Sequence, residues 1–273
     1  MINKEKAKGL LEEQKSNIDI AFDKLSKIQD KVKKRWKRWI DWPFRLLDEQ
    51  TQWMIEWKVY TIWAFSNTWK SQLSYEYVSY FLKKWKKVLF VSTEVWSWDL
   101  LAFIWRNYYK VNYQDILFDK YKLKKEDFKN LSLFDDTHNF ERISKLVDEY
   151  KPDILVIDFI QSIDHIWTSE YEKMSKIATD LQELTIRKDL ITISLSQVNN
   201  DSRNKDWVNI TLKWSWWLFA SSDVIFWLYR DNWEIKLAIT KNKFWPYNKI
   251  FNVIMNFETW DIKMAKSLDC NEI

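Results

Sequence analysis

The scarcity of glycine is the strongest constraint on how this 273-residue chain can turn. It contains one glycine, Gly9, and 20 tryptophans. Average usage would give about 19 glycines in a chain of this length. Glycine adopts positive φ angles without steric cost, and many tight turns and helix ends depend on it. A chain of this composition has to place bulky residues where a globular protein normally uses glycine.

The tryptophans lie at positions where a turn would use glycine. Trp57 precedes a β-branched run, Trp85 separates a helical stretch from an apolar run, and Trp245 precedes Pro246. We therefore hypothesise that the gene follows a code in which UGA specifies glycine, and that its UGA codons are read as tryptophan in this sequence. UGG codons at most of these positions would refute the hypothesis. The alternative is a chain that is truly rich in tryptophan, and Trp42 is a candidate for an authentic one.

The overall composition fits a globular protein of the cell interior. Hydrophobic residues make up 47% of the chain, which is enough for a sizeable core. No run approaches the ~18 apolar residues of a membrane span, and the charged amino terminus lacks the apolar centre of a signal peptide. We therefore expect a cytoplasmic protein that makes no membrane contact.

The residues that most often bind metals are scarce. One cysteine, Cys270, and two histidines, His138 and His165, cannot form a disulfide framework or a zinc site of ordinary ligand number. A bound metal would therefore use carboxylates or hydroxyls. The net charge of +4 permits an anionic partner without requiring one.

Residues 1–38 are predicted to form an amino-terminal helix and a basic linker, and residues 39–273 a single larger domain. The apolar stripe of the helix can pack against the chain's own domain or against a neighbouring subunit, and the sequence leaves both open. The basic run KKRWKR, at 33–38, is interpreted as a solvated linker. The stripe consists of Leu11, Ile18, Leu25 and Val32 at seven-residue spacing, with Ala21 and Ile28 between them.

From Lys58 onward, short β-branched runs alternate with helical stretches. Such alternation predicts an α/β fold with a mostly parallel central sheet and helices on both faces. The last runs follow one another without helices, which predicts a β-rich, antiparallel carboxy-terminal edge. The expected strands are 58–62, 86–92, 153–158, 190–196, 223–229, 235–241 and 250–257, and the expected helices are 70–84, 97–109, 140–150 and 169–187.

The first expected strand runs into a segment that, with glycine at position 69, reads A-x-x-x-x-G-K-S and then continues as a helix. This strand, loop and helix order is typical of a phosphate-binding loop. Backbone N–H groups would hold the phosphates of ATP, Lys70 would neutralise the β- and γ-phosphates, and Ser71 would ligate Mg²⁺. The loop residues are Ala64, Phe65, Ser66, Asn67, Thr68, Trp69, Lys70 and Ser71.

Three further polar residues follow the ends of expected strands. Asp158 ends an apolar run, as the Mg²⁺-binding carboxylate of P-loop ATPases does, or is structural. Glu94 can orient and deprotonate an attacking water, or cap a helix. Gln197 can sense the γ-phosphate, or simply begin a loop. Because ligand sites in such sheets lie at the carboxyl ends of strands, we expect these three residues to converge with Lys70.

Between about Ile40 and Asp261 the chain resembles the ATPase domain of DnaB-type replicative helicases, a RecA-like group of P-loop NTPases in helicase superfamily 4. Reading tryptophan as glycine improves every matching segment that contains tryptophan. The resemblance implies that Glu94 is the catalytic base and Gln197 the γ-phosphate sensor. The matching segments are AFSNTWKS, STEV, ILVIDFIQSI, SLSQVNN, LKWSWWLFASSDVIFWLYRD and TKNKFWP.

The resemblance also implies how subunits and DNA take part. The family forms hexameric rings with single-stranded DNA in the central channel, and a lysine-x-arginine pair reaches the ATP site of the neighbouring subunit. The matching residues here are Lys241 and Lys243, so a lysine replaces the arginine finger and lacks its bidentate geometry. A cationic loop would follow the DNA backbone, although its residues fit a solvated loop nearly as well. This loop contains Arg203, Lys205 and Lys213.

The amino-terminal helix matches the family's linker helix, which docks on the next protomer. No segment matches the family's separate amino-terminal domain, so contacts with primase or a loader are not implied. The sequence therefore predicts a Mg²⁺-dependent ATPase that moves along single-stranded DNA and unwinds duplexes. The alternative is a RadA-like or KaiC-like ATPase that acts in recombination or signalling without unwinding. An authentic Trp69 would instead favour a non-catalytic interaction protein, because an indole would crowd the phosphate loop.

Overall fold

The computed structural model describes residues 39–164, 169–198, 216–244 and 249–266, together with 18, 21–23, 25, 26, 29 and 30. The chain divides into two units, Met1–Ile40 and Asp41–Ile273. The described residues between 18 and 30 are helical, as the apolar stripe predicts, and the side chains of Ile18, Phe22 and Leu25 are exposed. A short strand, β1 (Trp39–Ile40), ends this unit.

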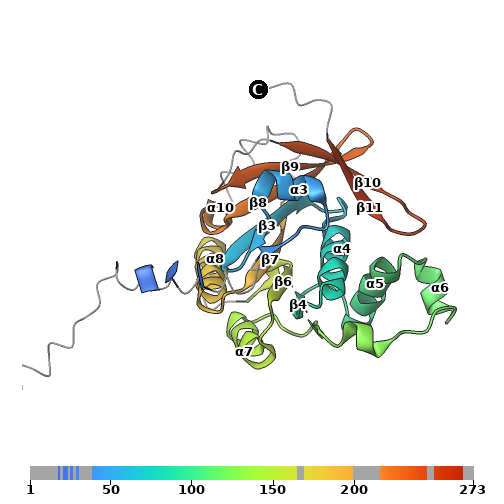
Figure 1. Ribbon diagram of the computed structural model, residues 1–273, viewed down its shortest axis with the longest axis horizontal. Helices are drawn as coiled ribbons and strands as arrows, with labels where there is room; N and C mark the ends of the chain where they lie inside the picture. The colour runs from blue at the N-terminus through green and yellow to red at the C-terminus, as the bar shows by residue number, and fades with distance from the viewer. Residues whose placement is uncertain are drawn as a thin grey trace, which may run out of the picture. The chain divides into compact units, whose positions relative to one another are not determined.

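The second unit is built around a nine-stranded sheet in the order β11-β10-β9-β8-β3-β7-β6-β4-β5 (Figure 1). The strands from β8 to β5 are mutually parallel, and β9, β10 and β11 add antiparallel pairings at the other edge. These strands are β3 (Lys58–Phe65), β4 (Val88–Ser92), β5 (Leu131–Phe134), β6 (Ile154–Asp158), β7 (Ile191–Val198), β8 (Val224–Asp231), β9 (Glu234–Asn242), β10 (Ile250–Met255) and β11 (Ile262–Lys266).

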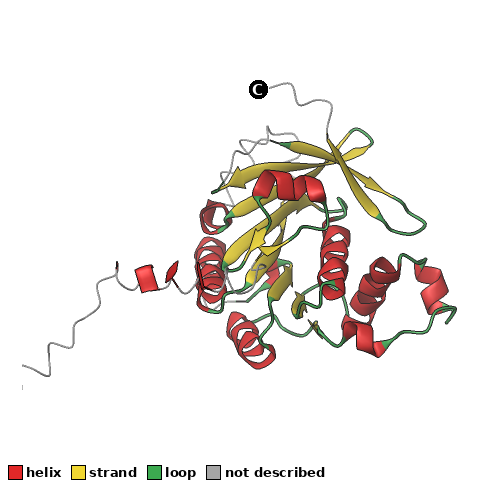
Figure 2. Ribbon diagram, viewed as in Figure 1, coloured by secondary structure: helices red, strands yellow, loops and turns green. Residues whose placement is uncertain are grey.

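Helices cover both faces of the sheet (Figure 2). In Figure 1, α4 and α5 lie on one side of the strands, and α7, α8 and α10 lie on the other. Among the described residues, no helix has the length and apolar character needed to cross a membrane. The remaining elements are β2 (Met54–Ile55), α3 (Arg45–Thr51), α4 (Lys70–Lys83), α5 (Ser97–Tyr109), α6 (Tyr113–Leu117), α7 (Phe140–Tyr150), α8 (Glu170–Arg187), α10 (Trp216–Ser221) and the 3₁₀ turns η1 (Lys125–Phe128) and η2 (Ile160–Ser162).

The α/β class, the parallel core and the antiparallel carboxy-terminal edge confirm the sequence prediction. The four expected helices end within one residue of those observed. The sequence prediction missed β5 and β11 among the strands. β5 has four residues, all only half buried, and β11 carries lysines among its few apolar residues, so neither forms a long apolar run.

The central strands are apolar because both of their faces are covered. All five residues of β4 and all five of β6 are buried, a pattern typical of parallel strands between two helical layers. On one face, side chains of β4 and β6 pack with α7 and α8 in a cluster that includes Leu89, Val91, Leu155, Ile157, Ile143 and Leu181.

Trp42 anchors the other face of the sheet. Its side chain is 2% exposed, and its ring makes edge-on contacts with Tyr60, Tyr77 and Phe226 at centroid distances of 5.2, 5.5 and 5.1 Å. Its indole Nε1 donates a 2.7 Å hydrogen bond to Thr51 Oγ1. A buried indole normally needs such a partner, so this site accommodates both the ring and its polar atom.

Replacing Trp42 with alanine is expected to lower the free energy of unfolding by about 3–5 kcal/mol, because it removes a buried ring and leaves a cavity. The free energy is measured by urea unfolding. Trp233→Ala is the matched control: Trp233 is 94% exposed, so its loss should change stability by no more than about 0.5 kcal/mol. Equal effects of the two substitutions would contradict the anchoring role of Trp42.

Candidate active site

The segment between β3 and α4 has the backbone of a tight loop that leads into a helix. Asn67 and Trp69 both adopt left-handed conformations, each with φ of 61°. Thr68 Oγ1 closes the loop by donating a 2.5 Å hydrogen bond to the carbonyl of Phe65. Trp69 is the N-cap of α4, but no side chain from this position caps the first helical turn. The amides of that turn are therefore suited to bind an anion.

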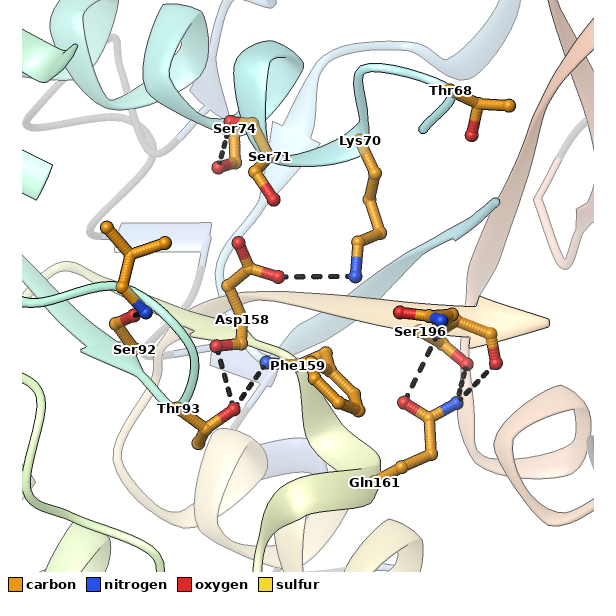
Figure 3. A network of polar contacts seen from close by, with 12 residues as sticks. Thr68, Lys70, Ser71, Ser74, Ser92, Thr93, Asp158, Phe159, Gln161 and Ser196 are labelled. Atoms are coloured by element: carbon orange, nitrogen blue, oxygen red, sulfur yellow. Dashed lines mark hydrogen bonds and ion pairs between the residues drawn. The ribbon is translucent and has the colours of Figure 1, made fainter. Parts of the chain in front are cut away.

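Lys70 and Asp158 form a buried ion pair at the centre of the site (Figure 3). Their side chains are 8% and 3% exposed, and Lys70 Nζ lies 3.3 Å from Asp158 Oδ1. The geometry of this contact is not that of a hydrogen bond, because both atoms are buried without a hydrogen-bond partner. Buried charged atoms of this kind are costly unless another group satisfies them. A phosphate beside Lys70 and a cation beside Asp158 would do so.

Strand register brings the expected site residues to one edge of the sheet. Asp158, the last residue of β6, pairs with Ser92 of β4 and with Leu195 of β7. Gln197 of β7 pairs with Ala64 of β3, the first residue of the phosphate-loop pattern. The carboxyl ends of four parallel strands therefore meet at the start of α4, as expected for a ligand site in such a sheet.

Thr93 ties the end of β4 to the end of β6. Its amide and its hydroxyl both donate to the carbonyl of Asp158, at 2.7 and 3.1 Å, and the hydroxyl accepts a 3.0 Å hydrogen bond from the Phe159 amide. Glu94 is the next residue, and its side chain is exposed. Partial burial of its carboxyl group raises the pKa of Glu94; the charge of Lys70 lowers it, and that of Asp158 raises it. Glu94 is therefore electrostatically coupled to the ion pair.

Gln161 holds the end of β7 in place, and sequence reasoning missed it. Its side-chain Nε2 donates to Ser196 Oγ at 2.6 Å and to the Gln197 carbonyl at 2.9 Å (Figure 3). Its Oε1 accepts a 3.3 Å hydrogen bond from the Gln197 amide. The only sequence signal is its position three residues after Asp158. The exposed Gln197 side chain begins where this amide has fixed its backbone.

Lys241 and Lys243 do not join the other site residues. Lys241 opposes Ile225 near the start of β8, and its Nζ donates to the carbonyl of Phe219. Lys243 Nζ lies 3.5 Å from Asp223, whose carboxylate also accepts a hydrogen bond from the Val59 amide. Both lysines thus lie at the edge of the sheet where β3 begins, opposite the phosphate loop.

The oxygen atoms near Lys70 fit a magnesium ion better than a transition metal. Ser71 and Asp158 offer a hydroxyl and a carboxylate, and Figure 3 shows both directed toward the same space. Among the described residues there is no group of three or more histidine, cysteine or acidic side chains that could hold a metal ion. The proposed DNA-contact residues Arg203, Lys205 and Lys213 lie outside the described part of the chain.

Comparison with known proteins gives matches only among solved structures. No family model matches, and no curated protein matches. A separately solved ATPase domain superposes with a TM-score of 0.75 and 18% identity, covering 92% of this chain and 99% of that one. A DnaB-like replicative helicase, described with its interactions with primase, gives a TM-score of 0.72 and 18% identity over 88% of this chain. The chain spans 66% of the length of that helicase.

The chain has the fold of a DnaB-like helicase ATPase domain. The resemblance inferred from the motifs is therefore confirmed at the level of the fold. A KaiC-like protein, PH0186 from Pyrococcus horikoshii OT3, shares this fold with a TM-score of 0.60 and 15% identity, covering 84% of this chain and 99% of that one. The RecA-like ATPase fold is thus common to both of the functional alternatives considered above.

The lysine at the opposite edge predicts a pH dependence of stability. Burial, followed by the nearby charge of Lys243, lowers the pKa of Lys241 from 10.5 to about 8, against the opposing effect of Asp223. Between these two pH values the unfolded chain binds more protons at this residue than the folded chain, so its contribution to stability rises with pH. The free energy of unfolding relative to Lys241→Met should therefore increase over this range.

Urea unfolding of both proteins across that pH range measures this difference, and the subtraction removes the contributions of other lysines and tyrosines. Lys243→Met should weaken the effect, because it removes a charge that lowers the pKa of Lys241. A pH-independent difference between the wild type and Lys241→Met would show that this lysine is not perturbed.

Proposed function

We propose that this chain is a Mg²⁺-dependent ATP hydrolase that uses the site between β3, α4, β4 and β6. The observation that carries the proposal is the buried pair of Lys70 and Asp158, whose facing polar atoms lack hydrogen-bond partners. The pair lies at the carboxyl ends of parallel strands and beside an uncapped helix start. Together these features suit a ligand that carries both anionic oxygens and a divalent cation.

The chain's own groups divide the work of binding between them. The first-turn amides of α4 and the Lys70 ammonium would bind the β- and γ-phosphates. Ser71 and Asp158 would hold Mg²⁺, which would neutralise charge on the phosphate oxygens. Binding would separate Lys70 from Asp158 and give each a partner that it lacks in the ion pair.

Glu94 is proposed to orient and deprotonate the attacking water. It follows directly after Thr93, which is hydrogen-bonded to the end of β6, so its backbone is fixed relative to Asp158. Its raised pKa makes it a stronger base than an ordinary glutamate while leaving it ionised near neutral pH. Gln197, held by Gln161, is proposed to sense the γ-phosphate by hydrogen bonding.

We further propose that hydrolysis is coupled to movement along single-stranded DNA by a ring of copies of this chain, as a cytoplasmic helicase. The similarity in fold to a solved ATPase domain and to a DnaB-like helicase supports this proposal. The position of Lys241 and Lys243 also supports it, because they lie far from the chain's own phosphate loop and are available to another copy. The KaiC-like match favours, as a second candidate, an ATPase that does not unwind DNA.

Two substitutions in a Trp69→Gly background should separate binding from chemistry. Lys70→Ala should abolish ATP binding, because it removes the only cation of the buried pair. Glu94→Gln should leave ATP binding intact and lower kcat by about 10²–10⁴-fold, the usual contribution of a general base. ATP affinity is measured by calorimetry with Mg²⁺, and turnover by phosphate release.

Two matched controls test whether these effects are local. Lys83→Ala removes a lysine from the far end of the same helix, and Glu149→Gln neutralises an exposed glutamate on α7. Both should leave affinity and turnover unchanged. Hydrolysis that survives Lys70→Ala or Glu94→Gln at the control level would refute the assigned site.

A forked-duplex assay separates the two candidate functions. With ATP and Mg²⁺, a helicase should displace one strand of the fork, and Glu94→Gln should abolish displacement along with hydrolysis. Hydrolysis that single-stranded DNA stimulates, without any strand displacement, would favour the non-unwinding alternative. The ATPase assignment would stand in either case.

A further inference from the structure

The backbone conformation of several tryptophans is one that glycine adopts and tryptophan avoids. Twelve non-glycine residues in the described part of the chain have positive φ, and five of them are tryptophans. An even spread of the 20 tryptophans would put about one in twelve such positions, and tryptophan has no preference for them. The five are Trp53, Trp57, Trp69, Trp85 and Trp260, with φ between 53° and 73°.

We infer that these five residues and Trp233 are glycines in the protein that its own cell makes, and that Trp42 is a tryptophan there. The inference does not depend on the proposed function. It extends the hypothesis of a reassigned UGA codon to named positions, because the structure separates sites that need glycine from a site that needs an indole. Three local structures carry the argument.

Trp85 ends α4 at the position where a helix most often uses glycine. The Trp85 amide bonds to the carbonyl of Leu82 at 2.9 Å, and the Lys86 amide bonds to that of Phe81 at 3.0 Å. This pair of bonds defines a Schellman motif, whose left-handed residue is Trp85, with φ of 58°. The indole is 70% exposed and so gains little from burial. The position fits glycine both in its backbone conformation and in its exposure.

Trp260 and Trp233 occupy the corresponding positions in hairpins. Trp260 has φ of 53° in the turn between β10 and β11, which the Asn256 amide closes by a 2.9 Å bond to the Asp261 carbonyl. Trp233 is the second residue of the two-residue turn between β8 and β9, after Asn232 with φ of 53°. Asparagine followed by glycine is the preferred sequence of such turns, and Trp233 is 94% exposed.

Trp69 extends the same argument to the phosphate loop. It stands at the start of α4 with φ of 61°, and its ring lies edge-on to Phe257 at 5.2 Å. Trp42 is the opposite case, because its ring is buried among three aromatic side chains and its Nε1 has an acceptor. Removing its side chain would empty a packed site, whereas the exposed indoles of Trp85 and Trp233 leave no comparable site.

Mass spectrometry of the protein purified from its natural source tests the assignment directly. Tryptic peptides 46–58, 59–70 and 250–263 should contain glycine at positions 53, 57, 69 and 260. Peptide 39–45 should retain tryptophan at position 42, which makes it an internal control. Tryptophan at the first four positions, or glycine at position 42, would overturn the inference. The gene should correspondingly have UGA at the six glycine positions and UGG at position 42.

A stability measurement tests the conformational reason independently of the codons. Trp85→Gly should have a higher thermal midpoint than Trp85→Ala, because both remove the indole but only glycine lacks the Cβ atom that opposes positive φ. At Trp98, exposed within α5, the order should reverse, because alanine is the better helix former. Equal midpoints for the two Trp85 variants would show that the backbone at this position does not require glycine.

Discussion

The register between the parallel strands β3, β7, β6 and β4 is the constraint on which the site depends. It places Ala64 opposite Gln197, and Asp158 between Ser92 and Leu195. A slip of one residue in any of these pairings would turn the affected side chains to the opposite face of the sheet. The register is held by strands that are buried on both faces, so the apolar core determines where the polar atoms meet.

Side chains from the loops then tie the strand ends together. Thr93 binds both the carbonyl of Asp158 and the amide of Phe159, and Gln161 binds both polar backbone atoms of Gln197. Each such bond contributes only about 0.5–1.5 kcal/mol of net stability, so their main effect is geometric. They connect the residue proposed to hold Mg²⁺ with the residue proposed to sense the γ-phosphate. A site preorganised in this way can respond to a ligand as a unit.

The sequence predicted the central strands, four helices and the four converging site residues, because each belongs to a local pattern. A long apolar run defines a strand, and a polar residue at its carboxyl end is placed by the topology of a parallel sheet. Gln161 could not be found in this way. Its hydrogen bonds reach residues 35 and 36 positions away, and no local periodicity records such a contact. The short edge strand β5 lacks a periodic signal for a similar reason.

The edge occupied by Lys243 determines how it could take part in hydrolysis. Its amide bonds to the Asp223 carbonyl, and the Asp223 amide bonds to that of Val59, near the start of β3. The phosphate loop begins at the other end of the same strand, beyond Phe65, and a strand of this length separates the two ends by roughly 20 Å. A lysine side chain cannot span that distance. If Lys243 acts on ATP, it therefore acts on ATP bound to another copy of the chain, and association of the copies is part of the chemistry.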